Sequence, residues 1–350
     1  MNKIIIADIT SLRNGENSFG HFFQVADMYR DIFGCNNTIV AGGPVYRKKY
    51  HLVYALKYDV DLKELEGTIS RIVCKAKEVI NCINVLRRLN KDFIIFQDYS
   101  NTSLFLGILL CKTKSKLFLI QYKSEVEKFY RKFLFSLIRD RISGIIVPNK
   151  KVGEKYKVPY LVVPDYIYTH DKFPEKKEAY EYDYGVFGII REGKDVVGVA
   201  MKFIGSKKKI IIAGSVQSKI LLEKLTEISI NNKNIIFINK YLSQKEYKFY
   251  FNNTRVIILP YTDDYYEDAS SGVVFDILFA GKPVIARRFP VFSFIKEKEL
   301  GLLYDKLEEI NFENLWSREE YSKFQKNIEK YICINRDNKK RLVNFISEGN

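Results

Sequence analysis

Short apolar runs rich in β-branched residues recur along this 350-residue chain, with room for a helix between most neighbours. The run Arg-Val-Ile-Ile-Leu at 255–259 is typical of them. Because such runs lack a polar face, they suit strands that are covered on both sides, as in a parallel sheet. Helical patterns separate several runs, so the sequence predicts an α/β fold. The expected strands are 3–8, 38–41, 93–97, 116–121, 144–148 and 160–163, and then 184–187, 209–213, 234–238, 255–259 and 283–286.

The length of the chain predicts about two domains, each large enough to bury its own core. The stretch 168–183 is rich in charge and poor in aliphatic residues, which is typical of a hinge between domains. We therefore expect a first domain at 1–166, a linker at 167–182, a second domain at 183–317 and C-terminal helices at 318–350.

A polar loop after the run at 255–259 leads into a helical pattern. Ser270, Ser271 and Gly272 stand directly before apolar residues at helical spacing, which begin with Val273 and Val274. Small residues let the backbone approach a ligand closely, and the unpaired N–H groups of a first helical turn favour an anion. The helix dipole contributes only about 0.3–1 kcal/mol at an exposed site, so partner cations are needed. The alternative is an ordinary N-capped helix without a ligand.

The stretch from 260 to 286 resembles the nucleotide-sugar signature of GT-B glycosyltransferases, in particular the retaining glycosyltransferase family 4 of bacterial surface polysaccharide synthesis. In that family an acidic residue, seven further residues and a second acidic residue bracket the helix start, and an Ala-Gly-x-Pro-Val-Ile strand follows. Here the acidic residues are Asp268 and Asp276, and the strand pattern lies at 280–286. Both acidic positions are usually Glu, so each Asp is a departure, and Glu267 is the alternative for the first role.

The resemblance implies a fold and a set of roles. The fold is GT-B, in which two Rossmann-like doubly wound parallel-sheet domains face a central cleft and a C-terminal helix crosses back to the acceptor-binding first domain. Asp268 or Glu267 would be catalytic and contact the transferred sugar, while Asp276 would accept hydrogen bonds from the donor ribose. Ser270, Ser271 and Gly272 would hold the donor diphosphate.

A second cluster follows the expected strand at 184–187, where the sequence reads Gly-Ile-Ile-Arg-Glu-Gly-Lys at 188–194. In family 4 the arginine and lysine of a similar pattern neutralise the donor diphosphate, which assigns that role to Arg191 and Lys194. Positioned cations stabilise the charge that develops on a departing diphosphate, and guanidinium and ammonium groups both bind phosphate. The alternative is a pair of solvated surface cations.

The first loop offers further candidates. Family members carry a glycine-rich turn and a histidine there, and the best match in this chain is Gly15, Gly20 and His21 at the cleft of the first domain. A histidine in the amphipathic helix expected at 18–33 is the structural alternative. Many relatives also place a histidine after a central strand, where this chain has Gln121.

The chain carries a formal net charge of +15, which favours anionic partners without choosing among them. The segment 125–141 places aromatic and aliphatic residues at helical spacing among basic ones, so it can lie on an anionic membrane surface. A helix packed on the first sheet is the alternative. No pattern typical of nucleic-acid binding supports that class of partner.

The compartment and the cofactor follow from composition. The longest apolar stretch, 104–111, is too short to span a bilayer, and the N-terminus lacks a secretory signal. Five cysteines without a CxxC pair indicate a reducing cytoplasm. Three scattered histidines predict no metal site, and the resemblance likewise implies transfer without a metal or other cofactor.

Together these features predict a cytoplasmic glycosyltransferase of the hexosyltransferase type that can lie peripherally on the inner face of the plasma membrane. It would move a sugar from a nucleotide-diphosphate-sugar to a saccharide or lipid-linked saccharide in surface polysaccharide synthesis, with retention of anomeric configuration by resemblance. The alternatives are a non-catalytic GT-B partner protein and a nucleotide-sugar epimerase.

Overall fold

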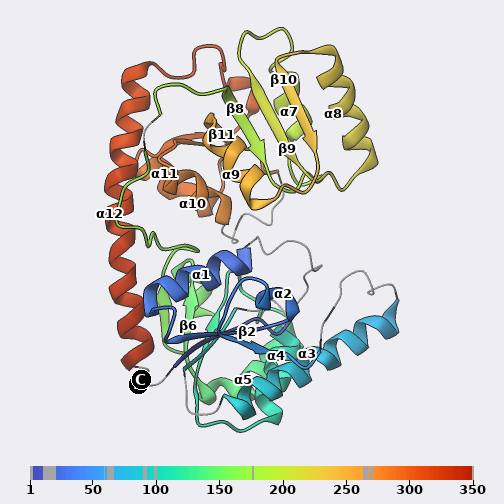
Figure 1. Cartoon of the computed structure of the whole chain (residues 1–350), viewed down its shortest axis with the longest axis vertical. Coiled ribbons are helices and arrows are strands. Elements are labelled where there is room, and N and C mark those ends of the chain that lie inside the picture. Colours follow the sequence, from blue (N-terminus) through green and yellow to red (C-terminus); the bar gives the residue numbers. More distant parts are fainter. Residues whose placement is uncertain are drawn as a thin grey trace. The chain divides into compact units, whose positions relative to one another are not determined.

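The computed structural model describes residues 3–10, 21–58, 60, 67–89, 93–97, 101–175, 177–262, 267 and 271–348. The chain forms two compact units. Unit 1 consists of Met1–Thr169 with Asn335–Asn350, and unit 2 consists of His170–Ile334. Each unit is built on one parallel sheet with helices on its faces (Figure 1). The predicted α/β class, with two doubly wound parallel sheets, is confirmed.

The sheet of unit 1 has seven strands in the order β3-β2-β1-β4-β5-β6-β7, and every neighbouring pair is parallel. The direction in which successive strands are added reverses between β1 and β4. Sheets of this kind bind ligands at the carboxyl ends of the strands beside such a reversal. The strands are β1 (Ile4–Ala7), β2 (Thr38–Gly42), β3 (Val53–Ala55), β4 (Phe93–Phe96), β5 (Lys116–Ile120), β6 (Ile142–Val147) and β7 (Tyr160–Val162).

Helices cover both faces of this sheet. The main core lies between the strands and three helices that contact one another in sequence, α3 (Thr68–Arg88), α4 (Asn101–Leu110) and α5 (Phe129–Ile138). The other face meets the last part of α12 (Arg318–Glu348), where the Phe345 ring occupies the space that a side chain at Gly144 would need. The remaining helices are α1 (His21–Phe33), α2 (Pro44–Arg47), the 3-10 turn η2 (Arg139–Arg141) and α6 (Lys150–Glu154).

The sheet of unit 2 has six parallel strands in the order β10-β9-β8-β11-β12-β13, with the reversal between β8 and β11. Its strands are β8 (Tyr182–Phe187), β9 (Ile210–Gly214), β10 (Ile235–Asn239), β11 (Thr254–Leu259), β12 (Val284–Arg287) and β13 (Gly301–Tyr304). Its helices are α7 (Val196–Met201), α8 (Lys219–Asn231), α9 (Gln244–Asn252), α10 (Gly272–Phe279) and α11 (Ser293–Glu297), with 3-10 turns η4 (Pro290–Phe292) and η5 (Leu307–Glu309).

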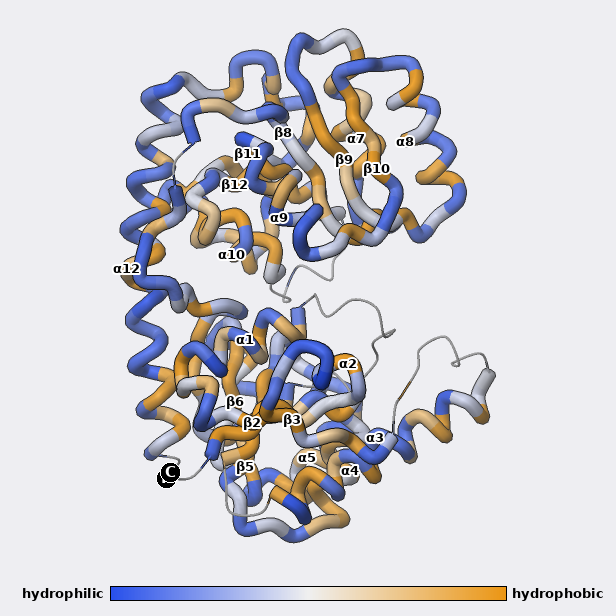
Figure 2. The backbone as a smooth tube through the Cα atoms, viewed as in Figure 1, coloured by the Kyte–Doolittle hydropathy of each residue, from blue (hydrophilic) through white to orange (hydrophobic). Residues whose placement is uncertain are grey.

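The strand interiors are apolar, as their sequences require. Figure 2 shows the apolar residues gathered on the strands and on the inner sides of the helices. In unit 2 the core joins strand residues such as Val186, Ile212 and Ile258 to helix residues such as Val199 and Leu225. Among the described residues, no helix combines the length and the hydropathy that crossing a lipid bilayer demands.

Candidate active site

Two loops meet at the carboxyl edge of the unit 2 sheet, beside the point where the strand order reverses. The loop after β8 begins at Gly188, whose φ of +93° is a left-handed conformation that favours glycine. A Cβ at Gly214, the last residue of β9, would collide with the Gly188 carbonyl, so both glycines are needed for this close approach. The chain then turns toward β11 and places Arg191 and Lys194 at the sheet edge.

Backbone hydrogen bonds fix the loop after β8 against the end of β11. Asp195 N–H donates to the Pro260 carbonyl at 2.7 Å, and Thr262 N–H donates to the Gly193 carbonyl at 3.0 Å. An isolated antiparallel bridge pairs Lys194 with Tyr261 in the same place. The segment that carries the predicted cations is therefore held beside the segment that leads to the predicted signature loop.

Lys194 is a partly buried cation next to a second one. Its Nζ atom lies 5.5 Å from the centroid of the Tyr261 ring, which is a cation–π arrangement. Burial, and to a smaller extent the neighbouring Arg191 guanidinium, together lower the pKa of Lys194 to about 8. Both causes disfavour the charged ammonium, whereas an anion bound at this point would favour it.

Tyr261 also connects the cations to the start of α10. Its hydroxyl lies 2.9 Å from the Ser271 Oγ atom, and both side chains are buried. Ser271 is the N-cap of α10, yet within the described part of this loop its side chain makes no capping hydrogen bond to the helix. The ordinary capping role that we considered for this helix start is therefore not played by Ser271.

Asp276 is held by a tyrosine from a neighbouring helix. The Tyr247 hydroxyl donates to Asp276 Oδ2 at 3.3 Å, and the Tyr247 ring packs against Phe251 and Phe187. Burial raises the pKa of Tyr247 well above its ordinary value, and the Asp276 carboxylate adds to the shift. Tyr247 thus stays a hydrogen-bond donor, and one carboxylate oxygen of Asp276 has a fixed partner. Sequence reasoning did not find Tyr247, because its spacing to Asp276 follows no local pattern.

Glu267 is exposed and lines a pocket of about 400 Å³ in unit 2. The other walls come from the segments after β12 and around α11, and include Arg288, Phe289 and Lys296. Arg288, directly after β12, donates a hydrogen bond at 2.8 Å to Asp305, directly after β13. Asp268 and Ser270, which we predicted at the sugar and the diphosphate, lie outside the described residues, as do Gly15 and Gly20.

Lys282, in the Ala-Gly-Lys-Pro pattern, lies away from these loops. It is buried, and its Nζ atom donates to the Thr254 carbonyl at the first residue of β11, the amino edge of the sheet. Burial lowers the pKa of Lys282 to about 7. This lysine therefore ties the starts of β11 and β12 together and does not face the candidate donor site.

In unit 1, His21 begins α1 and is enclosed by tyrosines. Its Nδ1 atom lies 2.7 Å from the Tyr166 hydroxyl, which donates in turn to Gln24 at 2.7 Å, and its ring packs edge-on to Tyr122. Gln121 is tied as well, since it donates to Asn101 at 2.8 Å and accepts from Tyr156 at 2.7 Å. The residue that replaces the histidine of many relatives is thus a structural one.

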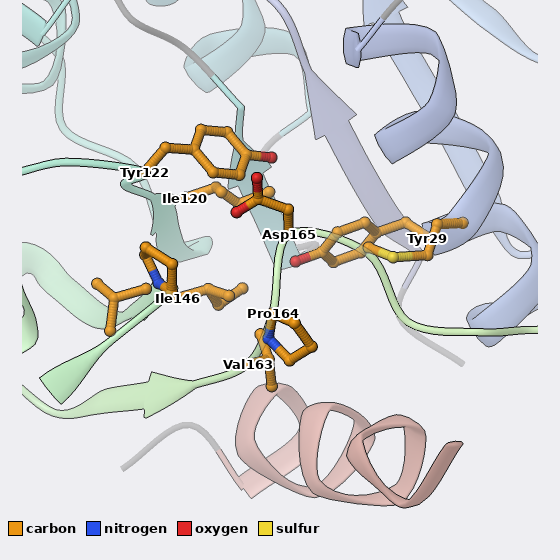
Figure 3. A pocket seen from close by; sticks show the side chains of 10 residues that line it. Tyr29, Ile120, Tyr122, Ile146, Val163, Pro164 and Asp165 are labelled. Carbon is orange, nitrogen blue, oxygen red and sulfur yellow. The ribbon is translucent and has the colours of Figure 1, made fainter. Parts of the chain in front are cut away.

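A small pocket lies at the carboxyl ends of β5, β6 and β7, and Figure 3 shows Tyr29, Tyr122 and Asp165 around it. Its volume of about 10 Å³ holds one water molecule and no sugar.

Gln97, directly after β4, is a candidate site residue that sequence reasoning missed. It is buried at the reversal point of the sheet, and neither of its side-chain polar atoms has a hydrogen-bond partner among the described residues.

Comparison with known proteins identifies the fold of the chain but finds no protein that is similar to it in sequence. No protein-family model matches the chain, and no curated protein matches it in sequence. Among solved structures, apo OtsA matches over 99% of both chains with a TM-score of 0.69 and 10% identity. The chain has the GT-B fold.

Two further solved structures match over nearly the whole chain. An α,α-trehalose-phosphate synthase (UDP-forming) from Burkholderia xenovorans, solved with glucose-6-phosphate, matches with a TM-score of 0.68 and 9% identity over 99% of this chain and 100% of its own. AviGT4, a glycosyltransferase involved in avilamycin A biosynthesis, matches with a TM-score of 0.58 and 11% identity over 99% and 97%. At these identities the likeness establishes the GT-B fold alone, so the resemblance to family 4 in particular stays a prediction.

Proposed function

We propose that this protein is a glycosyltransferase that moves a sugar from a nucleotide-diphosphate-sugar to a saccharide acceptor. The observation that carries the proposal is the meeting of two loops at the carboxyl edge of the unit 2 sheet. There Tyr261 contacts Lys194 on one side and Ser271, at the start of α10, on the other. A paired cation site beside a helix start suits a diphosphate better than a neutral or cationic ligand.

The chemistry assigned to these residues is charge stabilisation. In the proposed reaction the bond between the anomeric carbon and the diphosphate oxygen breaks, and its electron pair stays on the diphosphate. The acceptor hydroxyl oxygen bonds to the anomeric carbon, and its proton passes to the departing phosphate. Arg191 and Lys194 would stabilise the charge that grows on the diphosphate, an effect that counts most in the transition state.

The remaining site residues take supporting roles in this proposal. Asp276, in contact with the Tyr247 hydroxyl, would bind the ribose hydroxyls. Glu267 or Asp268 would contact the transferred sugar, and the Ser271 and Gly272 amides would bind a diphosphate oxygen. The two cations make a resident metal or other cofactor unnecessary for charge neutralisation, so we propose that none is used.

The finer assignments rest on resemblance and on the neighbours. One structural neighbour is UDP-forming and was solved with a sugar phosphate, which supports a nucleotide-sugar donor and a saccharide acceptor here. We further propose that the transferred group is a hexose and that its anomeric configuration is retained. The setting is bacterial surface polysaccharide assembly in the cytoplasm, with a lipid-linked acceptor that the segment 125–141 helps to reach at the membrane.

Turnover of single-site variants tests the proposal. Arg191→Ala and Lys194→Ala should each reduce turnover by about 100-fold or more, since each removes a charge directed at the leaving group. Lys202→Ala is the matched control, because Lys202 is a partly exposed lysine directly after α7 in the same unit. The measurement is nucleoside diphosphate release with a donor and acceptor panel, with mass spectrometry of the products. Unchanged turnover in both site variants, or an epimerised donor as the product, contradicts the proposal.

A further inference from the structure

The layer formed by α3, α4 and α5 has an apolar outer face as well as an apolar inner face. The inner face packs on the unit 1 sheet and forms the main core of that unit. On the outer face, large apolar side chains from all three helices are exposed, and Figure 2 shows apolar segments along this layer. An exposed apolar surface that spans several elements is typical of a docking site.

The helix α3 carries apolar side chains on its outward side as well as on its inward side. The outward side carries Ile69, Ile72, Val73 and Ile80 at helical spacing, and the first two are 79% and 63% exposed. The buried side of the same helix includes polar residues such as Asn81, which bonds to the Tyr58 backbone. The packing of α3 within unit 1 therefore buries Cys82, Val85 and Leu86 in the core and leaves a second apolar stripe exposed.

On α5 the apolar residues divide between the two faces. The helix is shorter than the segment 125–141 that we considered, and its Phe135 and Ile138 are buried in the core. Phe129, 86% exposed, and Phe133, 56% exposed, lie one turn apart on the outer side. The inner side of α5 thus fits the alternative of a helix packed on the first sheet, while its outer side is exposed.

The helix α4 lies between the other two in this layer. It contacts both α3 and α5, and Leu109 and Leu110 at its end are exposed. Nearby, the ion pair between Arg131 and Glu125 and the contact of the Phe105 and Phe135 rings fix α5 on the layer. The outer apolar side chains therefore stand on a rigid base.

Among the described residues, the exposed charges on the first half of α3 and at the start of α5 are mainly positive. Arg71 and Lys75 are exposed on α3, and the one acidic residue of that helix, Glu78, is buried and paired with Lys75 at 2.8 Å. Lys128 and Lys132 are exposed at the start of α5, whose sequence from 129 to 138 contains no acidic residue. Two exposed acids beside α5, Glu127 and Asp140, are paired with Lys155 and Arg139.

We infer that the outer face of α3, α4 and α5 docks on an anionic lipid surface. Aromatic and aliphatic side chains at the centre suit the acyl boundary of a bilayer, and the surrounding cations suit anionic headgroups. A bilayer is favoured over a protein partner because the patch offers diffuse apolar area and positive charge with few polar groups for specific pairing. Only the link to a lipid-linked acceptor rests on the proposed function.

Flotation with vesicles, without any substrate, tests this inference. The full chain should bind vesicles that contain phosphatidylglycerol and phosphatidylcholine, and bind phosphatidylcholine alone much more weakly. Ile69→Ser with Ile72→Ser, and separately Phe129→Ser with Phe133→Ser, should each reduce binding about tenfold or more, since each pair removes two insertable side chains. Lys128→Gln with Lys132→Gln should reduce the binding to the anionic vesicles only.

The matched control is Ile220→Ser with Ile230→Ser on α8 of unit 2, where the side chains are 62% and 74% exposed. This control should float like the unaltered chain. No flotation of the unaltered chain, or full flotation of the Ile69 and Ile72 variant, overturns the inference. A variant that changes the oligomeric state in sedimentation while vesicle binding persists also overturns it and assigns the face to a second copy.

The same variants separate this inference from the proposed function. UDP binding, followed by thermal shift, should be unchanged in the vesicle-binding variants, because none of their residues lies in unit 2. Loss of flotation with intact transfer to a soluble acceptor would confine the effect to docking. Flotation without any sugar transfer would contradict the proposed function and would still support docking on a lipid surface.

Discussion

The lowered pKa of Lys194 makes a quantitative prediction about how diphosphate binding depends on pH. In the free protein the pKa is about 8, because burial and Arg191 both disfavour the charged ammonium. A diphosphate bound against this lysine would favour the charged form and raise its pKa again. Binding should therefore be accompanied by proton uptake whenever the free lysine is partly neutral, and affinity should fall as the pH rises through about 8.

The size of the effect follows from the two pKa values. If the complex restores the ordinary value of 10.5, the dissociation constant should rise about tenfold between pH 7 and pH 9, since one pKa unit corresponds to about 1.36 kcal/mol. The phosphate groups themselves contribute little to this slope, because their second pKa is about 6. At pH 8.5 the complex should take up about 0.75 proton.

Isothermal titration calorimetry with UDP, in pairs of buffers with different ionisation enthalpies, measures both the affinity and the proton uptake. Lys194→Arg is the control, because a guanidinium stays charged over this range and should give a flat profile. A wild-type dissociation constant that changes less than about twofold between pH 7 and pH 9 refutes the placement of the diphosphate at Lys194. The same slope in Lys194→Arg would refute it equally.

Two further predictions concern the groups that position the donor. Asp276→Asn should weaken ribonucleotide binding by about tenfold, the effect of a lost charge-assisted hydrogen bond, and Tyr247→Phe by less, as titration calorimetry would show. Equal affinity of Asp276→Asn for a ribonucleotide and its 2′,3′-dideoxy analogue is expected, and a remaining preference for the ribonucleotide would contradict the assigned role. Gly214→Ala should lower stability by about 1–3 kcal/mol in chemical unfolding, because its Cβ would displace the Gly188 carbonyl. An unchanged unfolding midpoint would show that the loop after β8 adjusts freely.

Most of the fold follows from local sequence. Each expected strand is present within two residues of its predicted ends, because short β-branched runs have few alternatives once both faces of a sheet are covered. Two strands at or near sheet edges were not predicted. β3 is only three residues long and partly buried, and β13 reads Gly-Leu-Leu-Tyr, which lacks the β-branched residues of the other strands. A weak local signal of this kind becomes a strand only when a neighbour supplies the hydrogen bonds.

The candidate site was less accessible to sequence reasoning. The positions of Arg191 and Lys194 after one strand, and of Ser271 after another, could be read from the chain. Their meeting depends on the strand order, which the runs themselves do not encode. The contact of His21 with Tyr166, 145 positions away, and the unusual outward side of α3 likewise depend on tertiary packing.

The long helix α12 has a consequence for how the chain is made. Its residues from Asn335 onward belong to unit 1, and there Leu342 and Ile346 are fully buried and Phe345 covers Gly144. This part of α12 is synthesised after unit 2, yet it completes unit 1, whose strands are synthesised before unit 2. Until then the face of β5 and β6 that meets Phe345 stays open to solvent, so a nascent chain stalled before residue 335 should attract chaperones through that face.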